Sequence, residues 1–345
     1  MVEKRDLDII FNNAIDWETF RDKRILVTAA TGRLGMYIVE ALVKADLDYN
    51  LNMRIIAHAR NEKKLQTVFG STLELPNVEM LLQDITDRIE MDGSVDYIFH
   101  TAGPAAPKDF TETPVETLWA HVSGTRNVLE LAREKKSEKV IYISTVEIYG
   151  ENIGEEPFAE TDMGVIRSDQ VRSCYPEAKR LCETMLASYA AEYGVSYTGA
   201  RMSHTFGPGI SLEDGRSFAE FIQCSLKGED IVLHSDGSAV RPYTYVADAI
   251  GAVFMIATKG TANEYYNIAN LDNQISIRDL AQLIAELSPS GKTKVVFDHA
   301  DGKLNYLNFK LGVMNTEKIK KLGWRPDIDL KTAFRYTMES FEQSR

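Results

Sequence analysis

The sequence predicts an α/β fold, in which a parallel sheet is covered by helices on both faces and joined to a smaller C-terminal lobe. From residue 24 onward, short apolar runs alternate with segments of helical periodicity, as in a doubly wound parallel sheet. After Gly207-Pro208-Gly209 this alternation gives way to loops and shorter elements. A chain of 345 residues with 44% apolar content can bury the large core that such a fold requires.

The expected elements follow one another along the chain. Strands are expected at residues 24–28, 53–59, 95–100, 139–144, 195–202 and 265–268, and helices at 34–44, 115–133, 176–193, 246–258 and 277–287. We divide the chain into an N-terminal extension (1–23), a first domain (24–206 plus 242–269) and an interleaved C-terminal lobe (207–241 plus 270–345). Apolar residues of the extension indicate a short amphipathic element that docks on the first domain. A ligand cleft is expected between the lobes, at the carboxyl ends of the strands.

Charge and cysteine content narrow the possible partners. With 39 basic and 51 acidic residues the net charge is −12, which disfavours nucleic acid and anionic membranes as partners. Any anionic substrate must then be bound by local Arg or Lys residues. The three cysteines are too few for a disulfide scaffold and lack zinc-ligand spacing, so we expect no metal site and a reducing, cytoplasmic setting. The N-terminal segment has no hydrophobic signal core.

Tyr175 and Lys179 form the most informative pair of polar residues. Their i,i+4 spacing places phenol and ammonium on one face of a helix. A lysine cation there can lower the pKa of the tyrosine, so that the phenol exchanges a proton near neutrality. Thr145, at the end of a predicted strand, can hold the reacting oxygen beside them. The three residues predict the acid–base half of a hydride-transfer site.

The first predicted strand ends in Thr28-Ala29-Ala30-Thr31-Gly32-Arg33-Leu34-Gly35 and runs directly into a helix. This turn resembles the dinucleotide fingerprint of the extended short-chain dehydrogenase/reductases, although Ala29 occupies the first glycine position. Gly32 and Gly35 keep the close backbone approach to a pyrophosphate at a helix N-terminus. The resemblance implies a Rossmann-like fold, with the first domain binding a dinucleotide and the C-terminal lobe binding the substrate.

The second predicted strand lacks the acidic residue that usually binds the adenosine ribose. Arg60 follows that strand and, with Arg33, is able to pair with a 2′-phosphate. We therefore expect NADP(H) in preference to NAD(H); the alternative for Arg60 is stacking on adenine or simple solvation. By resemblance, the cofactor-binding residues are Thr28, Ala30, Thr31, Gly32, Arg33, Leu34, Gly35, Arg60, Asp84, Ile85, Thr101, Ala102, Gly103, Tyr175 and Lys179.

Further motifs resemble the nucleotide-sugar enzymes of the NAD-dependent epimerase/dehydratase family, and within it the UDP-glucuronate decarboxylase branch. They include Ser144-Thr145-Val146-Glu147-Ile148-Tyr149-Gly150, Asp214-Gly215-Arg216 and Leu322-Gly323-Trp324-Arg325-Pro326. The resemblance covers roughly residues 24–335. It implies Thr145, Tyr175 and Lys179 as catalytic residues, with Glu147 as a base or a substrate-hydroxyl anchor. A homodimer formed through helices 115–133 and 176–193 is implied in the same way.

The chain departs from this pattern at several positions. Val146 replaces the serine of decarboxylases and the aspartate of dehydratases, and an arginine expected against a substrate carboxylate is absent from residues 301–308. Lys303 offers only a point charge there. His121 and His204 each replace an asparagine, for which core packing or a ribose contact is the plainer role.

For the substrate side, the resemblance places Arg241 on the pyrophosphate, Arg216 near the nucleotide and His204 in the substrate loop. A surface salt bridge is the alternative for each arginine. The sequence favours net reduction of a nucleotide-linked keto-sugar, because Val146 and the missing arginine weaken decarboxylation or dehydration. A redox-neutral decarboxylase or epimerase, and more remotely a non-catalytic NAD(P)-binding sensor, remain as alternatives; polysaccharide precursor synthesis is the implied setting.

Overall fold

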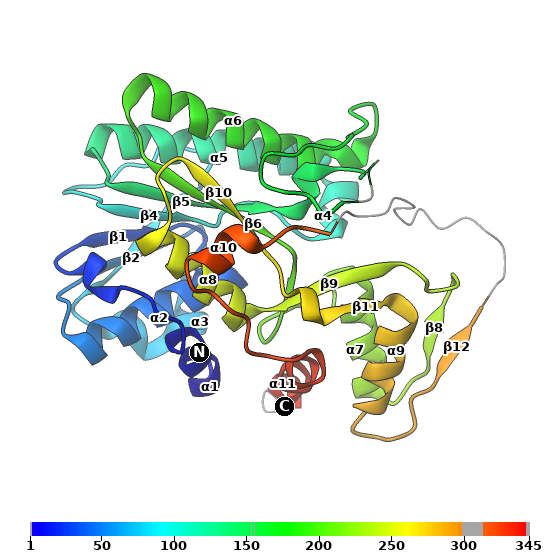
Figure 1. Ribbon diagram of the computed structural model, residues 1–345. Helices are drawn as coiled ribbons and strands as arrows, with labels where there is room; N and C mark the ends of the chain where they lie inside the picture. The colour runs from blue at the N-terminus through cyan, green and yellow to red at the C-terminus, as the bar shows by residue number, and fades with distance from the viewer. Residues whose placement is uncertain (1, 153, 155, 299–312, 343–345) are drawn as a thin grey trace.

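The computed structural model describes residues 2–152, 154, 156–298 and 313–342. Seven parallel strands form the main sheet, in the order β10-β6-β5-β4-β1-β2-β3 (Figure 1). These strands are β1 (Arg24–Val27), β2 (Arg54–Ala59), β3 (Val78–Leu82), β4 (Tyr97–His100), β5 (Lys139–Thr145), β6 (Tyr197–Met202) and β10 (Glu264–Ile268). The doubly wound sheet expected from the sequence is confirmed. Its order reverses between β1 and β4, so a ligand crevice is expected at the carboxyl ends of these strands.

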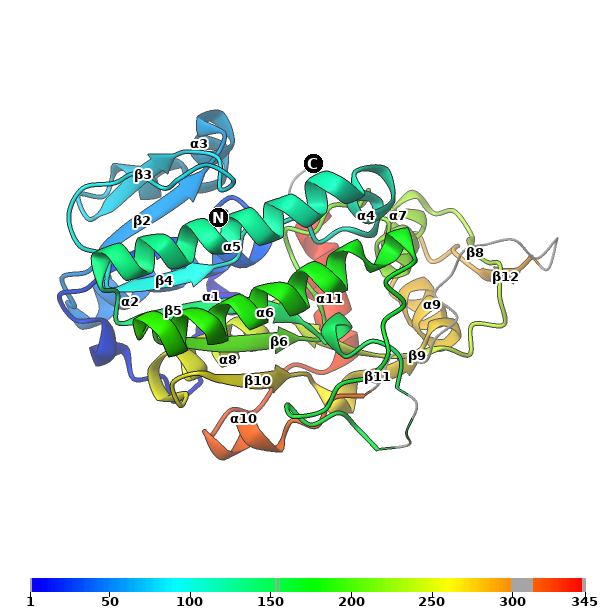
Figure 2. The ribbon, with the colours of Figure 1, turned by 90° about the horizontal axis from the view of Figure 1, so that it is seen from above.

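Helices cover both faces of this sheet. On one face α5 (Pro114–Lys135) and α6 (Cys174–Tyr193) lie side by side, as Figure 2 shows. On the other face lie α2 (Arg33–Tyr49) and α8 (Val246–Lys259), while α3 (Glu62–Phe69) connects β2 to β3. Helix α8 is buried around nearly its whole circumference because it is enclosed by the sheet, α1 and α2, which explains its apolar sequence.

The smaller lobe is built from short elements. A three-stranded sheet has the order β11 (Gln274–Ser276), β9 (Val240–Tyr245) and β7 (His204–Phe206), and β8 (Ile231–Leu233) pairs with β12 (Val295–Phe297). The helices of this part are α7 (Ser217–Lys227), α9 (Ile277–Glu286), α10 (Glu317–Lys321) and α11 (Leu330–Glu342). Phe206 stacks on Phe334 of α11 at 4.2 Å between ring centroids, which fixes β7 against the C-terminal helix. The division of the chain into domains proposed from the sequence remains a prediction.

Shorter helical segments complete the chain. They are α1 (Lys4–Phe11), α4 (Pro107–Glu112) and the 3₁₀ turns η1 (Trp17–Phe20), η2 (Gly70–Glu74), η3 (Val146–Tyr149), η4 (Val171–Ser173) and η5 (Leu271–Asn273).

The N-terminal extension docks as the sequence indicated. Ile10 on α1 is fully buried, and the buried Asp6 carboxylate accepts hydrogen bonds from the hydroxyls of Tyr37 on α2 and Tyr245 on β9. Arg5 bonds Glu339 of α11 at 2.6 Å. The extension therefore ties the cofactor-side helix α2 to β9 and α11 of the smaller lobe.

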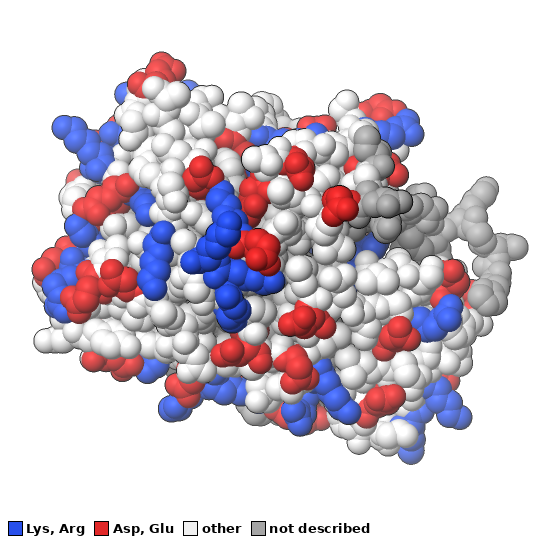
Figure 3. Space-filling view, in the orientation of Figure 1, with Lys and Arg blue, Asp and Glu red and all other residues white. Residues whose placement is uncertain are grey.

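The molecular surface carries both signs of charge. On the face in Figure 3 acidic and basic side chains are interspersed, and one group of basic side chains lies over α10. Within the described ranges, no helix is long and apolar enough to cross a membrane.

The turn between β1 and α2 has an unusual backbone conformation. Ala29 occupies the left-handed region, with a φ of 47°, which an L-residue adopts at a cost of roughly 1–2 kcal/mol. Gly35 packs against this turn so closely that an added Cβ would lie 2.5 Å from the Ala29 carbonyl oxygen. The turn therefore needs glycine at position 35, whereas alanine at position 29 is tolerated at a cost.

Two matched substitutions test this account of the turn. Ala29→Gly should raise the free energy of unfolding by about 1 kcal/mol, because glycine adopts a positive φ without strain. Ala30→Gly should lower it by about 0.5–1 kcal/mol, because Ala30 has no positive φ and glycine only adds freedom to the unfolded chain. Urea denaturation measures both; equal destabilisation by the two changes would contradict the argument.

Candidate active site

A cavity of about 150 Å³ opens at the carboxyl ends of β1, β4, β5 and β6. Both lobes contribute to its walls, which are formed by Arg33, Leu34, Thr101, Gly103, Ala105, His121, residues 143–147, Tyr175, Lys179, residues 202–205 and Arg216. All four residues predicted as catalytic therefore line one space, together with His204 and Arg216 from the predicted substrate set.

Tyr175 and Lys179 project from the first two turns of α6. Both are buried, at 7% and 6% exposure, and the Lys179 ammonium donates a hydrogen bond of 2.7 Å to the carbonyl of Ile143 on β5. It also lies 4.7 Å from the ring centroid of Tyr142. Burial lowers the pKa of Lys179 to about 8, so the ammonium is the main form at neutral pH.

The Tyr175 phenol is held between rings. Phe110 of α4 stacks on it with centroids 4.4 Å apart and planes inclined by 15°, and the His121 ring lies at 5.3 Å. Burial, and next the Glu147 carboxylate, raise the pKa of Tyr175 to about 12, while the Thr145 hydroxyl and the Arg216 guanidinium oppose the shift. The phenol is therefore protonated at neutral pH, and the lower pKa beside Lys179 that the i,i+4 spacing predicted is not found, because burial outweighs any nearby cation.

Glu147 has a cationic partner, Arg172, that no sequence pattern predicted. Arg172 contacts both carboxylate oxygens of Glu147, at 2.7 and 2.9 Å, and its guanidinium lies 4.4 Å from the centroid of Phe110. Arg172 therefore connects Glu147 to the ring that stacks on Tyr175. No local pattern marks these contacts, because Phe110 and Tyr175 are far apart in the chain and Arg172 lies in a 3₁₀ turn without periodicity.

His121 is neutral in this setting. Its Nε2 donates to the carbonyl of Pro104 at 2.9 Å, and burial, followed by the Lys179 charge, holds its pKa well below the usual value. Gly103 passes so close that an added Cβ would lie 2.1 Å from the His121 ring. His121, which replaces the asparagine of the family that the sequence resembles, is thus a closely packed, neutral hydrogen-bond donor in this chain.

The predicted cofactor residues form two groups. Thr28 does not face the cavity: its hydroxyl accepts from the amides of Thr101 and Ala102 and lies 3.0 Å from His100 Nδ1, which ties the ends of β1 and β4 together. Leu34, Thr101 and Gly103 line the cavity. The turn and the start of α2 are formed by Ala30, Thr31, Gly32 and Gly35. Ile85 and Ala102 are buried.

The two arginines expected at a 2′-phosphate point in different directions. Arg60 is 77% exposed, with its guanidinium 3.6 Å from the Asp84 carboxylate. Arg33 reaches across the cleft, where its Nη2 donates to the carbonyl of Thr205 at 2.7 Å. Because Arg33 points toward Thr205, it no longer supports a preference for NADP(H) over NAD(H). Sequence spacing alone does not show the direction of a side chain.

The three predicted substrate residues come together beside the cavity. His204 at the start of β7 is opposite Tyr243 on β9, and its pKa falls to about 3 because of burial first and then the Arg241 and Arg216 charges. Arg216 pairs with Asp214 at 3.1 Å and donates to the carbonyl of Ala105 in the other lobe. The Arg216–Asp214 pair is part-buried, and the hydrogen bond from Arg216 to Ala105 bridges the lobes, unlike the surface salt bridge considered as its alternative.

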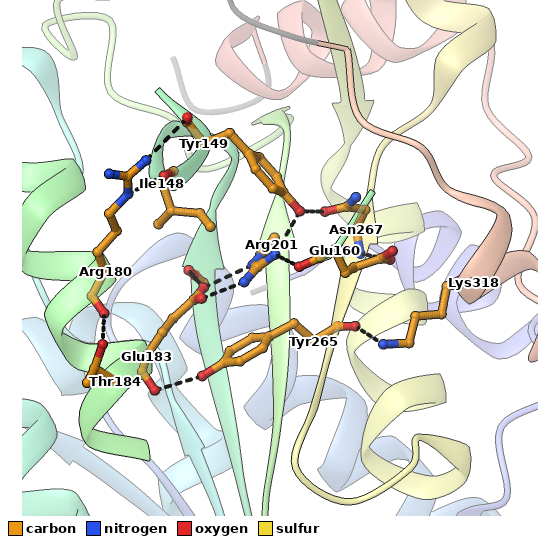
Figure 4. A network of polar contacts seen from close by, with 11 residues as sticks. Ile148, Tyr149, Glu160, Arg180, Glu183, Thr184, Arg201, Tyr265, Asn267 and Lys318 are labelled. Carbon is orange, nitrogen blue, oxygen red and sulfur yellow. Dashed lines mark hydrogen bonds and ion pairs between the residues drawn. The ribbon is translucent and has the colours of Figure 1, made fainter. Parts of the chain in front are cut away.

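A buried polar network behind the cavity connects the elements that carry Thr145, Tyr175 and Lys179 (Figure 4). Arg201 on β6 makes two hydrogen bonds to the Glu183 carboxylate on α6, of 2.7 and 3.2 Å, with both side chains nearly inaccessible. Glu183 also accepts from Ser144, the neighbour of Thr145, at 2.6 Å. The pair therefore links β5, β6 and α6 at the level of the reacting groups.

The same network continues into the strand at the edge of the sheet. Arg201 donates to the Tyr149 hydroxyl at 2.8 Å, and Tyr149 in turn donates to Asn267 of β10 at 2.6 Å. Arg201 also lies 4.7 Å from the ring centroid of Tyr265. Every polar atom of the Arg201 guanidinium thus has an acceptor or an aromatic neighbour, as a buried cation requires.

Comparisons with known proteins agree with this geometry. Residues 25–269 match the model of the NAD dependent epimerase/dehydratase family. The chain belongs to this family. Its curated relatives include UDP-glucuronic acid decarboxylase 6 of Arabidopsis thaliana, 29% identical over 322 residues that cover 92% of this chain and 88% of the relative. UDP-glucuronic acid decarboxylase 1 of Xenopus tropicalis is 28% identical over 327 residues, which cover 93% of this chain and 72% of the relative.

Solved structures share the fold. UDP-glucose 4-epimerase of Thermotoga maritima, solved with UDP-glucose, is 25% identical with a TM-score of 0.77, covering 93% of this chain and 99% of that one. UDP-glucuronic acid 4-epimerase of Bacillus cereus, solved with UDP-glucuronic acid and NAD, is 21% identical with a TM-score of 0.77, covering 93% and 100%.

A nicotinamide dinucleotide fits the residues present. The turn at residues 29–35 brings backbone amides to the N-terminus of α2, where a pyrophosphate is stabilised. The cavity beside Thr145, Tyr175 and Lys179 leaves space at the reacting groups. Buried nitrogens of Arg33 without hydrogen-bond partners among the described residues are further donors for an anionic ligand.

The role of the Arg201–Glu183 pair can be tested by removing its members singly and together. Arg201→Met should lower the free energy of unfolding by about 3–5 kcal/mol, because it leaves a buried carboxylate without its cation. The double variant Arg201→Met/Glu183→Met should lose less than the sum of the single variants.

Arg133→Met is the matched control, because Arg133 and Glu130 form an exposed pair that is worth at most about 1 kcal/mol. Urea denaturation gives all four values. A cost for Arg201→Met no greater than that for Arg133→Met would show that the buried pair is dispensable.

Proposed function

We propose that the protein converts a nucleotide-activated sugar by redox-neutral hydride transfer, and that its net reaction is decarboxylation of a nucleotide-linked uronic acid. The strongest support is that one cavity is lined by Thr145, Tyr175 and Lys179 together with the cationic side chains of Arg33 and Arg216. The relatives named as UDP-glucuronic acid decarboxylases support the same substrate class.

The chain's own residues supply proton transfer and positioning. The Tyr175 phenol is protonated in the ligand-free site, so it must first lose that proton; its phenolate would then take a proton from a secondary sugar hydroxyl and later return it, with the Thr145 hydroxyl holding the same sugar oxygen. Lys179, fixed by Ile143, places a cation beside the site. Bound NAD would supply a hydride acceptor that returns the hydride to the same carbon.

Val146 discriminates between dehydration and decarboxylation as the step that would follow oxidation of the sugar. It is buried and apolar, so it can neither remove a proton from carbon nor protonate a leaving hydroxyl. Dehydration needs both steps. Decarboxylation of a β-keto acid needs neither, since the carbon–carbon bond breaks as carbon dioxide leaves, its electron pair moves to the ketone oxygen, and a proton then adds to carbon. The valine that the sequence analysis took as unfavourable for decarboxylation is therefore compatible with it.

Net reduction of a keto-sugar with NADPH stands as the second candidate. Arg60, exposed at the end of β2, is the observation that favours it, because a 2′-phosphate has access to its guanidinium. The expectation had rested on Arg33 as well, and Arg33 is directed to the substrate loop. The redox-neutral reaction is accordingly the stronger proposal.

A homodimer is also proposed. Val115 and Trp119 on α5 and Leu181 on α6 are large apolar side chains with 61%, 56% and 47% exposure on the two helices that lie side by side over the sheet. A symmetric contact between these helices of two copies would cover them.

The reaction can be tested with UDP-glucuronate, NAD and the purified protein. We expect release of carbon dioxide and formation of a UDP-pentose with no net change in nicotinamide absorbance. Tyr175→Phe should lower the rate about 10²–10⁴-fold while NAD binding persists, because only the transferred proton is lost. Tyr189→Phe, on the same helix but bonded to Glu130 at the surface, should leave the rate unchanged. Other nucleotide uronates and keto-sugars form the comparison panel, and stoichiometric consumption of NADPH with a keto-sugar would refute the redox-neutral reaction.

A further inference from the structure

Arg33 occupies an unusual position for an arginine. It is the first residue of α2, directly after Gly32 of the cofactor turn, yet its Nη2 bonds the Thr205 carbonyl in the substrate loop at 2.7 Å. Its side chain thus crosses from the wall that would hold the cofactor to the wall that would hold the substrate.

Two of its three guanidinium nitrogens are unused. Nε and Nη1 are buried and have no hydrogen-bond partner among the described residues, although the side chain lines the reaction cavity. Buried polar groups are nearly always hydrogen-bonded, so two unpaired donors on one buried cation indicate that a ligand uses them. The Nε–H and Nη1–H groups lie on different edges of the planar guanidinium, so each can donate to a different oxygen of a diphosphate.

The surroundings do not neutralise this cation. Burial, and next the charge of Arg216, lower the pKa of Arg33 to about 10, while the effect of Asp214 is smaller and opposite. Asp214 pairs with Arg216 through Oδ2, while its buried Oδ1 has no hydrogen-bond partner among the described residues, and His204 beside them is neutral. In a chain of net charge −12, this corner of the cavity retains excess positive charge, which an anionic ligand would compensate.

We propose that Arg33 is a diphosphate anchor that couples the cofactor turn to the substrate loop. A dinucleotide and a nucleotide sugar each carry a diphosphate, and either one presents oxygens to the Nε and Nη1 donors. Because the Nη2 bond to Thr205 is already formed, an anion bound by Nε or Nη1 links α2 to β7 through a single side chain. This role replaces the 2′-phosphate contact expected from the sequence. It rests on the ligands of the proposed function but not on its net reaction.

Binding measurements on the full-length protein separate the two sources of diphosphate. Calorimetric titrations with ADP-ribose and with UDP are made on the wild type and on Arg33→Met, Arg33→Lys and Arg60→Met. Arg33→Met should weaken the binding of one diphosphate by about 10–100-fold. The weakened ligand should be ADP-ribose if Arg33 binds the cofactor diphosphate, and UDP if it binds the substrate diphosphate. Arg33→Lys should recover part of the loss, since it restores charge without the planar fork. Arg60→Met should leave UDP binding unchanged.

Melting temperature and cofactor preference distinguish a diphosphate anchor from a purely structural arginine and from a 2′-phosphate contact. The free Arg33→Met protein should melt at the wild-type temperature or above it, because the variant removes a buried cation that lacks compensation. The ratio of NAD to NADP affinities should stay constant in Arg33→Met. Three results would overturn the proposal. The first is that both diphosphate affinities stay within twofold of wild type, and the second is a selective loss of NADP affinity. The third is a lower melting temperature together with a loss of affinity for adenosine, which has no phosphate, equal to the loss for the diphosphates. None of these measurements involves turnover, so failure of the decarboxylase proposal would leave the binding result interpretable.

Discussion

The buried ion pair between Arg201 and Glu183 is the interaction on which the active-site geometry depends. Glu183 lies one helical turn beyond Lys179 on α6, and it accepts a hydrogen bond from Ser144, which directly precedes Thr145. One carboxylate therefore fixes both the helix that carries Tyr175 and Lys179 and the strand that carries Thr145. Buried pairs add little net stability because desolvation offsets the attraction, but loss of one partner is costly. We infer that the pair is present to define position.

The cavity uses burial to set the protonation of its groups. Burial keeps Tyr175 protonated, His121 and His204 neutral, and the pKa of Lys179 near 8, whereas Arg33, with a pKa lowered to about 10, remains charged. The cavity thus presents guanidinium groups to any anionic ligand, and the Tyr175 phenol carries its proton.

Much of the fold was predictable because it is encoded locally. Buried parallel strands are continuous apolar runs and their helices have a clear period, so every strand and helix expected from the sequence has a counterpart within a few residues. No range was predicted for β3, β7, β8, β9, β11 and β12; of these, β7, β8, β11 and β12 have only three residues each, too few to show a period. The possible carboxylate partner Lys303 lies outside the described residues.

The site was predictable to the extent that motifs define it. Tyr175, Lys179 and Thr145 were found because their spacing carries the chemistry, and their roles remain predictions. Arg201, Arg172 and Phe110 were missed because their partners are distant in sequence, and a contact of that kind leaves no local pattern. The direction of Arg33 was missed for a related reason: sequence spacing places a Cα atom, while the packing of the smaller lobe decides where the side chain points.

The most direct test of the central claim is whether the hydride returns to the molecule that lost it. UDP-glucuronate carrying deuterium at C4 and ¹³C in the sugar is mixed with unlabelled substrate, and the products are analysed by mass spectrometry. Redox-neutral transfer within one binding event predicts deuterium only in the ¹³C-labelled pentose, with none in the unlabelled product. Deuterium in unlabelled product, or turnover only with added NADPH and loss of the label, would contradict the account.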